Sequence, residues 1–294
     1  MQLTFRKVTP EDAVWAAPLM TASGKYGCEF SFATTYMWSD YYNVTIAEYN
    51  GAVLLRSDSG SIPSFLVPIG ISLEKGVELL SAYAKSEGFP LRLHGVDEET
   101  LTALNTLYPE QFRVQTNQGD YDYLYETEQL ATLPGKAYHG KKNHISAFSR
   151  QHDWHYEPLT DENADEVLAL SQAWCREKGG CKDAGLSSER WAIRRLLRYR
   201  EMLSVCGGLI RVDGNAVAFT LGSPVNAEVF DVQVEKALSA YAGAYAVINR
   251  EFAKTLTAYR YLNRENDMGI EGLRRAKESY HPAIVLKKYA CEWV

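Results

Sequence analysis

Residues 261–289 read YLNRENDMGIEGLRRAKESYHPAIVLKKY, and their polar residues are concentrated at one point. The pattern predicts the end of a strand that covers 260–263, followed by a polar turn, a helix and a last strand. Five polar residues, 263–267, follow the strand without a break, and Lys277, Tyr280 and His281 return one helix later. A plain surface helix does not need so many different groups at its start, whereas a site at the end of a sheet does. We therefore expect a functional site here.

The same order of elements occurs twice along the chain. Each half is predicted to contain a helix, a hairpin, a third strand, a helix, a strand, a short helix and a closing strand. The hairpins turn at Asn50-Gly51 and Asp213-Gly214, two dipeptides that strongly favour tight turns. The later elements fall at 64–69, 74–87, 91–95 and 112–114 in the first half, and at 228–234, 243–256, 260–263 and 283–286 in the second.

Hairpins followed by helix-linked strands predict a mixed α/β sheet in each half. We expect two domains, 1–133 and 134–294, with a bridging helix at 141–151. This order of elements resembles the GNAT acyltransferase fold. The doubled form resembles the tandem-GNAT aminoacyltransferases, which include the Fem peptidoglycan enzymes and the catalytic part of phosphatidylglycerol lysyltransferase.

The composition narrows the class of protein. The chain has 294 residues, 46% hydrophobic and 23% charged, which is typical of a globular protein. Its net charge of −6 argues against nucleic-acid binding by bulk electrostatics, so such a role needs a local basic patch. No apolar run approaches the roughly 20 residues that span a bilayer, and no signal-peptide pattern is present. Five scattered cysteines without a CxxC pair predict reduced thiols and a cytoplasmic location.

Several short segments resemble one bacterial family, the one related to the phosphatidylglycerol lysyltransferase C-terminal domain. They are 135–143 with Phe148, 234–237, 243–245, 248–250, 261–269 and 273–282. The resemblance implies direct transfer of an acyl group without a covalent intermediate. The donor, aminoacyl-tRNA or acyl-CoA, would be a cosubstrate and not a bound cofactor. The resemblance also places the donor between two splayed parallel strands, here beginning near residues 230–234.

The loop at 235–245 is rich in small residues, so its backbone can approach a ligand closely. The helix after it would begin near Gly243 and point its N-terminus at the donor's phosphates. The loop lacks the Q/R-x-x-G-x-G/A motif of GNAT proteins that bind CoA, because Ala240 stands where Gln or Arg is expected. A loop made small only for helix packing is the alternative.

The candidate catalytic residues are Glu265, Asp267 and Tyr280, because acyl transfer needs a group that takes the acceptor's proton. Two structural explanations stay open: Asp267 could cap the last helix, and Glu265 could pair with Lys277 or an arginine. A backbone N–H near 231–233 would serve the carbonyl oxygen. The candidate donor- or substrate-binding residues are Asp231, Gln233, Glu235, Lys236, Gly243, Tyr245, Asn249, Asn263, Arg264, Lys277, Lys136, Lys142 and Asn143.

The functional hypothesis is a tandem-GNAT acyltransferase that acts on a small-molecule or peptide amine or hydroxyl. The first half, which lacks the Asn-Arg-Glu cluster, would be structural or serve the acceptor side. The basic segment 136–150 is a candidate contact for tRNA phosphates. The two alternatives are a CoA-dependent N-acetyltransferase and a catalytically silent module that binds a small ligand. We expect no metal site, since His152 and His155 have no third ligand at a matching spacing.

Overall fold

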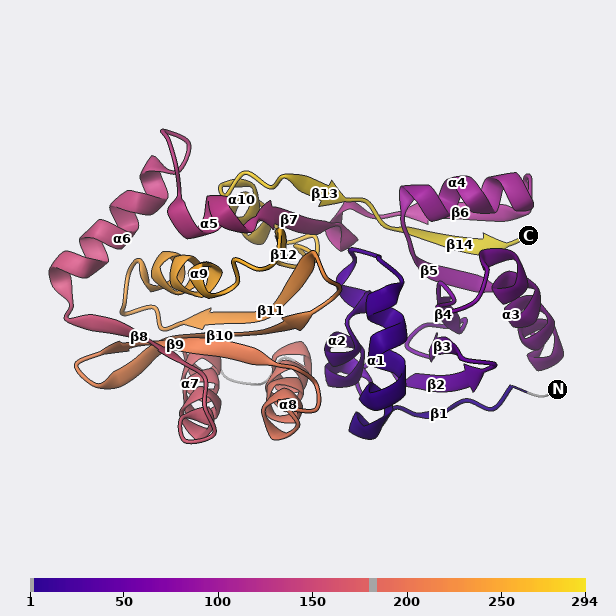
Figure 1. Ribbon diagram of the computed structural model, residues 1–294, viewed down its shortest axis with the longest axis horizontal. Coiled ribbons are helices and arrows are strands. Elements are labelled where there is room, and N and C mark those ends of the chain that lie inside the picture. Colours follow the sequence, from indigo (N-terminus) through magenta and orange to yellow (C-terminus); the bar gives the residue numbers. More distant parts are fainter. Residues whose placement is uncertain (1–2, 180–183) are drawn as a thin grey trace.

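The computed structural model describes residues 3–179 and 184–294, which form two seven-stranded mixed sheets with helices packed on them (Figure 1). The first sheet has the order β1 (Arg6–Lys7), β2 (Val44–Tyr49), β3 (Ala52–Ser57), β4 (Ser64–Leu66), β5 (Arg92–Val96), β14 (Tyr289–Trp293) and β6 (Phe112–Thr116). The second has the order β13 (Ile284–Leu286), β7 (Asp122–Glu126), β12 (Tyr261–Asn263), β11 (Val229–Ala237), β10 (Asn215–Pro224), β9 (Cys206–Val212) and β8 (Trp154–Pro158).

The helices follow the predicted repeat. They are α1 (Ala13–Ala22), α2 (Phe32–Trp38), α3 (Leu73–Glu87), α4 (Glu98–Leu107), α5 (Thr127–Thr132), α6 (His139–Gln151), α7 (Ala164–Glu177), α8 (Ala184–Arg198), α9 (Ala244–Thr255) and α10 (Glu271–Glu278), with short 3-10 turns η1 (Pro10–Asp12), η2 (Cys28–Phe30) and η3 (Gln118–Asp120). In each half a helix, α3 or α9, links a parallel pair of strands, β4–β5 or β11–β12. The predicted mixed α/β sheet therefore occurs twice, and α6 covers the segment where a bridging helix was expected.

The two halves exchange one strand each, which the sequence did not indicate. β7 leaves the first half and pairs between β12 and β13, while β14 returns from the end of the chain and pairs between β5 and β6. Figure 1 shows both crossings, with β7 above β12 and yellow β14 beside β5 and β6. The division between the sheets therefore does not coincide with the expected boundary at 133/134. Each exchanged strand gives two neighbours the backbone partners that they would otherwise lack.

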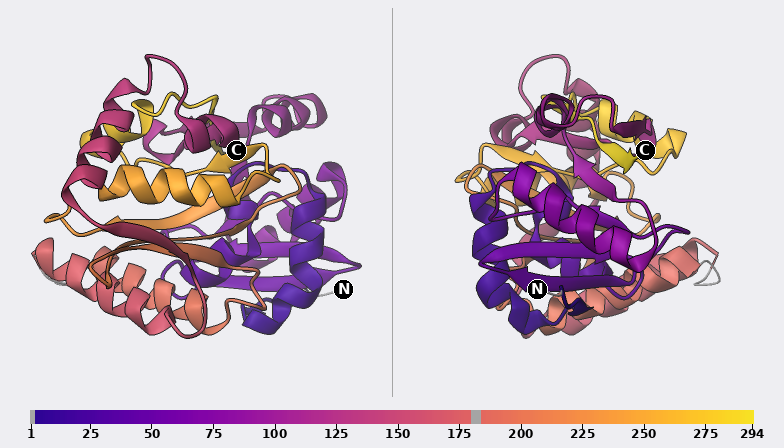
Figure 2. Two further views of the ribbon diagram at one scale, coloured as in Figure 1. Left: turned by 60° about the vertical axis from the view of Figure 1, so that its left-hand side comes forward. Right: turned by 90° about the vertical axis from the view of Figure 1, so that its right-hand side faces the viewer.

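The second sheet is covered on both sides. α9 packs over one face with α6 against it, and α7 packs over the other with α8 beside it, as Figure 1 and the left view of Figure 2 show. α2 of the first half packs against α8. Buried side chains such as Phe65 of β4 and Val229 of β11 belong to one continuous hydrophobic cluster, while Phe230 and Phe252 belong to a second cluster under α9. The first cluster joins the two halves.

A β-bulge in β11 reverses the direction of its side chains. Leu221 of β10 faces Val234 and Ser223 faces Asp231, so two residues of β11 lie opposite one residue of β10. Asp231 therefore points to the α2 side, whereas Glu235 points to the α9 side. Gly222 permits this close approach, because a Cβ there would lie 2.3 Å from the carbonyl oxygen of Asp231.

The cysteines only partly match the expectation of reduced thiols. Cys28, Cys206 and Cys291 are free thiols, but Cys175 is disulfide-bonded. Cys181 lies outside the described residues. Within the described ranges, no helix combines the length and the apolar character needed to cross a membrane.

Candidate active site

The second sheet opens where the polar residues gather. β11 and β12 pair in parallel as far as Asp231 and Asn263, and β11 then continues to Ala237 alongside β10. The expected splay between two parallel strands therefore begins at this pair. At the end of β12, successive side chains lie on opposite sides of the sheet. Asn263 bonds to Asp122, and Glu265 is influenced by Asp231 and Asp122, all on the α2 side. Arg264 contacts Glu235 on the α9 side.

On the α2 side, a helix of the first half holds two residues of β11. Thr34 Oγ1 donates to Asp231 Oδ2 at 2.8 Å, and Gln233 Nε2 donates to Thr34 Oγ1 at 2.8 Å and to Ser223 Oγ at 2.9 Å. Asp231 Oδ1 and Gln233 Oε1 are buried acceptors without a partner in the described part of the chain. Such atoms are costly unless a donor meets them, so this side is suited to a ligand that carries N–H groups.

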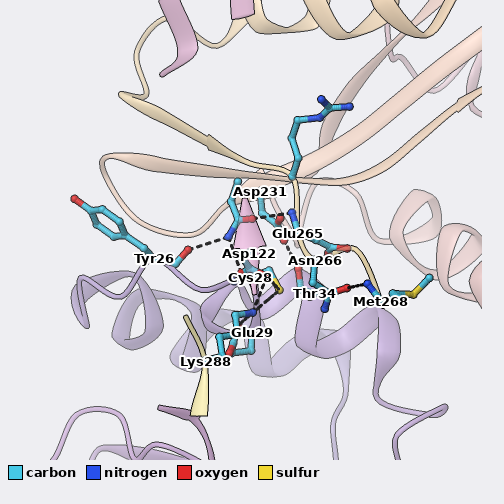
Figure 3. A network of polar contacts seen from close by, with 12 residues as sticks. Tyr26, Cys28, Glu29, Thr34, Asp122, Asp231, Glu265, Asn266, Met268 and Lys288 are labelled. Carbon is cyan, nitrogen blue, oxygen red and sulfur yellow. Dashed lines mark hydrogen bonds and ion pairs between the residues drawn. The ribbon is translucent and has the colours of Figure 1, made fainter. Parts of the chain in front are cut away.

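Next to this group, three residues surround the ammonium of Lys288, at the point where the chain passes between the two halves (Figure 3). Lys288 Nζ lies 2.8 Å from Asp122 Oδ1, 2.6 Å from Glu29 Oε2 and 3.4 Å from Cys28 Sγ. Asp122 Oδ2 accepts from Asn263 Nδ2 at 2.8 Å and from the Cys28 amide at 2.9 Å. Cys28, Glu29 and Asp122 could together hold a metal ion, but the ammonium of Lys288 contacts all three.

Glu265 lies between these groups. It is half-buried, and its amide donates to Asn263 Oδ1 at 2.7 Å. Burial, reinforced by the charges of Asp231 and Asp122, raises the pKa of Glu265 well above its ordinary value, although Lys277 and Lys288 oppose the shift. Burial also raises the pKa of Asp231 to about 8. Two acidic groups with raised pKa values therefore lie on the same side of the opening, a pattern that marks functional sites.

On the α9 side, the charges have the opposite sign. Arg264 Nη2 lies 2.9 Å from Glu235 Oε1, and Asn249 Nδ2 donates to Glu235 Oε2 at 3.1 Å. Arg264 Nη1 and Asn249 Oδ1 are buried without a partner in the described part of the chain. The ring of Tyr280 lies 3.8 Å from Lys141 Nζ and 4.9 Å from Arg264 Cζ. Two cations and one carboxylate leave this side positive.

Lys277 stands between the two sides. Its Nζ donates to the carbonyl oxygen of Arg264. Burial first and the charge of Arg264 second lower the pKa of Lys277 to about 8, against the influence of Glu265. The described part of the chain shows no ion pair of Glu265 with Lys277 or with an arginine. The Glu265 carboxylate therefore does not form the structural ion pair that was the alternative to a catalytic role.

Asp267, a predicted catalytic residue, forms structural hydrogen bonds through both of its carboxylate oxygens. It is fully buried and accepts from Tyr123 Oη at 2.7 Å, the Gly269 amide at 2.8 Å and Arg274 Nε at 2.8 Å. The Arg274 guanidinium lowers the pKa of Asp267 to about 2. It holds the turn before α10, whose N-cap residue is Ile270. Its oxygens are taken up by these bonds and do not join the opening.

Tyr280, the third predicted catalytic residue, lies on the α9 side between two cations. Burial raises the pKa of its hydroxyl to about 12, so the phenol keeps its proton at neutral pH. Its described contacts are through the ring and through its carbonyl oxygen, which accepts from Tyr138 Oη at 3.1 Å. These contacts give Tyr280 a role in placing charge and not in taking a proton.

Several predicted donor residues lie away from the opening. Gly243 packs under α6, because a Cβ on it would lie 2.7 Å from the carbonyl oxygen of His144. Lys236 Nζ pairs with Glu189 at 2.8 Å, and Tyr245 Oη accepts from the indole of Trp174 at 2.9 Å. These contacts attach Lys236 and Tyr245 to α7 and α8.

The basic segment lies next to the positive side. A surface groove is lined by Ala137, Gly140, Lys141, His144, Ser279 and His281. Lys136 and Asn143 are exposed near it, and Lys142 Nζ donates to the Gly135 carbonyl at 3.1 Å. Of the basic segment, Lys141 is therefore the residue that contacts the site, although Lys136, Lys142 and Asn143 were the predicted ones.

Sequence reasoning missed the contribution of the first half. Thr34, Cys28 and Glu29 sit in and before α2, where no local pattern marks them. Asp122 and Lys288 each stand at the start of, or just before, an exchanged strand. No local pattern in these two strands separates Asp122 and Lys288 from the other charged residues in and beside them, such as Glu126 and Glu292.

The comparisons with known proteins agree with this architecture. The family model described as phosphatidylglycerol lysyltransferase, C-terminal, matches residues 21–292. A conserved protein of unknown function from Bacteroides thetaiotaomicron is 34% identical, with a TM-score of 0.95 and full coverage of both chains. L-PGS from Bacillus licheniformis is 14% identical, with a TM-score of 0.69 over 98% of this chain and 93% of that one.

Two further proteins are also similar to the chain. FemX is 8% identical, with a TM-score of 0.62 over 98% of this chain and 96% of its own, and shares the fold. An uncharacterised protein of Mycoplasmoides gallisepticum is 23% identical over 179 residues, which are 59% of this chain and 56% of that protein. The predicted tandem GNAT-like fold is confirmed by the solved structures that this chain resembles. The chain belongs to the family of the phosphatidylglycerol lysyltransferase C-terminal domain.

Proposed function

We propose that the protein transfers an aminoacyl group directly from its donor to an amine or hydroxyl acceptor, at the opening between β11 and β12. One observation supports this most strongly. Asn263 and Glu265 lie on the α2 side of the opening, and Arg264 lies on the α9 side. One side offers acidic groups and buried acceptors, and the other offers cations. A donor that carries an ammonium at one end and phosphate at the other matches both.

The donor would be oriented by this polarity. Its ammonium would meet Asp231 Oδ1 and Gln233 Oε1, which have no partner in the described part of the chain. Its phosphate would meet Arg264 and Lys141, as charge-assisted contacts to phosphate usually involve these side chains. The ester carbonyl would then lie within the opening, where a backbone N–H of β11 at 231–233 would stabilise its developing negative charge.

Glu265 would take the proton. The acceptor's nitrogen or oxygen attacks the carbonyl carbon, and its proton passes to the carboxylate of Glu265. The ester C–O bond then breaks, and the leaving oxygen receives that proton. A base is most effective when its pKa lies near the working pH, and the raised pKa of Glu265 moves it in that direction.

The test is a donor and acceptor panel. Purified protein is incubated with aminoacyl-tRNA or acetyl-CoA and a set of amines and alcohols, and products are identified by intact mass. We expect acceptor plus aminoacyl as the product mass. Acetyl transfer alone would favour a CoA-dependent N-acetyltransferase. Saturable binding of every donor without turnover would favour a silent binding module.

The same assay tests the base. Glu265→Gln should lower turnover by about 100-fold or more, since a positioned general base contributes that much. Glu278→Gln, an exposed position at the end of α10, is the matched control and should leave turnover unchanged. Unchanged turnover in Glu265→Gln, with product formed by the wild type, would remove Glu265 from the mechanism.

A further inference from the structure

We infer that Lys288 is a positioning residue that connects the strand exchange to the reaction site, by holding Asp122 and, through Asp122 and Asn263, the backbone of Glu265. This inference rests on the proposed role of Glu265, but its test also has a readout that does not depend on activity. Lys288 lies between β13 of the second sheet and β14 of the first. It therefore occupies the point where the chain passes from one half to the other.

The first step is the binding of Lys288 itself. Its side chain is 13% exposed, and its ammonium contacts Asp122 Oδ1 at 2.8 Å and Glu29 Oε2 at 2.6 Å. Asp122 is fully buried and begins β7, the strand exchanged in the opposite direction. A buried carboxylate is costly without a cation, so Lys288 and Asp122 stabilise each other at the crossing.

The second step is a chain of hydrogen bonds that connects Asp122 to Glu265. Asp122 Oδ2 accepts from Asn263 Nδ2 at 2.8 Å, and Asn263 Oδ1 accepts from the Glu265 amide at 2.7 Å. Glu265 has a φ of +54°, in the left-handed region that side chains other than glycine rarely adopt. Such a conformation persists only where its surroundings fix it. Here the Asn263 carboxamide holds the Glu265 amide, and the Tyr123 amide donates to the Glu265 carbonyl oxygen at 3.3 Å.

The third step concerns charge. The groups that act on Glu265 are Asp231 of β11, Asp122 of β7, Lys277 of α10 and Lys288. The charge of Glu265 in turn contributes to the raised pKa values of Cys28 in η2 and of Tyr42 after α2. Of these, Lys277 and Lys288 are the two cations that favour the ionised carboxylate. Loss of the Lys288 charge should therefore raise the pKa of Glu265, whereas loss of the Asp122 charge should lower it.

The experiment uses the full chain labelled with 13C at the glutamate side-chain carboxyl. The Glu265 resonance is assigned by its absence in Glu265→Gln, and it is titrated in wild type, Lys288→Met, Lys288→Arg and Asp122→Asn. We expect the midpoint to move up in Lys288→Met, down in Asp122→Asn, and to stay near wild type in Lys288→Arg. Opposite shifts cannot come from general destabilisation, because both substitutions weaken the same pair.

Lys287→Met is the matched control. Lys287 is the neighbouring residue, is about half exposed and pairs with Glu98 at 2.9 Å, so its removal should leave the titration unchanged. The acid limb of the kcat/KM profile should follow the Lys288→Met titration to higher pH. A wild-type Glu265 midpoint in Lys288→Met, or shifts of the same sign in both variants, would overturn the inference.

The readouts keep the two proposals apart. Activity that survives in Glu265→Gln would end the role of Glu265 as the base, while the carboxyl titration would still decide whether Lys288 acts on it. If Lys288→Met does not fold, Asp122→Asn and Lys288→Arg provide the same comparison. Equal midpoints in those two variants would then refute the inference.

Discussion

Asn263 lies opposite Asp231 in the last facing pair of β11 and β12, and beyond this pair the two strands separate. The separation occurs next to the bulge in β11 that turns Glu235 toward α9. The opening therefore has one acidic side and one basic side, built from consecutive residues of the same two strands. This relationship makes the backbone around β11 as important as the side chains that it carries.

The close approach at Gly222 should be sensitive to one methyl group. Gly222→Ala would place a Cβ 2.3 Å from the Asp231 carbonyl oxygen and 2.4 Å from the Phe230 ring, so the bulge must shift. We expect a loss of about 2 kcal/mol or more in the free energy of unfolding, from overpacking, together with loss of turnover. Denaturant unfolding and the transfer assay measure the two effects.

Gly272→Ala is the control, because Gly272 lies in α10 with open space around its Cα. Alanine is a better helix former than glycine, so this variant should be neutral or more stable by roughly 0.5–1 kcal/mol. Equal stability of Gly222→Ala and wild type would show that the bulge does not depend on the missing side chain.

Asp267→Asn should weaken the fold, because the Asp267 carboxylate serves Tyr123, Gly269 and Arg274. We expect a loss of roughly 3 kcal/mol, as for a broken buried ion pair. The exposed pair of Glu271 and Arg275 gives the comparison, since Glu271→Gln should cost less than about 1 kcal/mol. A catalytic role would instead give full stability with no turnover.

The stability that Asp267 contributes should also depend on pH. Its pKa is lowered to about 2 in the folded protein, below the ordinary value, so the folded state favours the ionised form. The contribution is complete above about pH 4 and is lost as the pH falls toward 2. The difference in unfolding free energy between wild type and Asp267→Asn should shrink over that window. A constant difference down to pH 2 would contradict the assignment.

Lys141→Met should weaken donor binding. Lys141 Nζ lies over the Tyr280 ring next to Arg264, where no described carboxylate pairs with it. We expect the KM for a phosphate-bearing donor to rise by about tenfold with little change in kcat, and the slope of affinity against salt to fall by about one. Lys142→Met is the control, since Lys142 donates to the Gly135 carbonyl. Equal KM values for both variants would place the phosphate elsewhere.

The strand exchange should make the halves interdependent. Fragments 1–133 and 134–294 separate β14 from the first sheet and β7 from the second. Each fragment alone should lack a cooperative unfolding transition by circular dichroism, because two strands in each sheet lose their neighbour. The mixed fragments should recover the transition. Cooperative unfolding of either fragment by itself would show that the exchanged strands are dispensable.

Local patterns in the sequence were enough for the elements and for part of the site. Hairpin dipeptides, alternation and helical spacing depend on neighbouring residues, so the two repeated sheets were predictable. The density of polar groups after residue 263 also marked Asn263, Arg264, Glu265 and Lys277. The structure keeps all four at the opening.

Only the tertiary structure decided on which side of the sheet these side chains lie and which residues of the first half complete the site. The bulge in β11 divides Asp231 from Glu235, although spacing by twos would put both on one face. Thr34, Asp122 and Lys288 reach the site only through packing of α2 and exchange of β7 and β14. An apolar strand has the same local pattern whichever sheet accepts it. Partner choice depends on backbone hydrogen bonds and burial summed over both halves, which no local stretch contains.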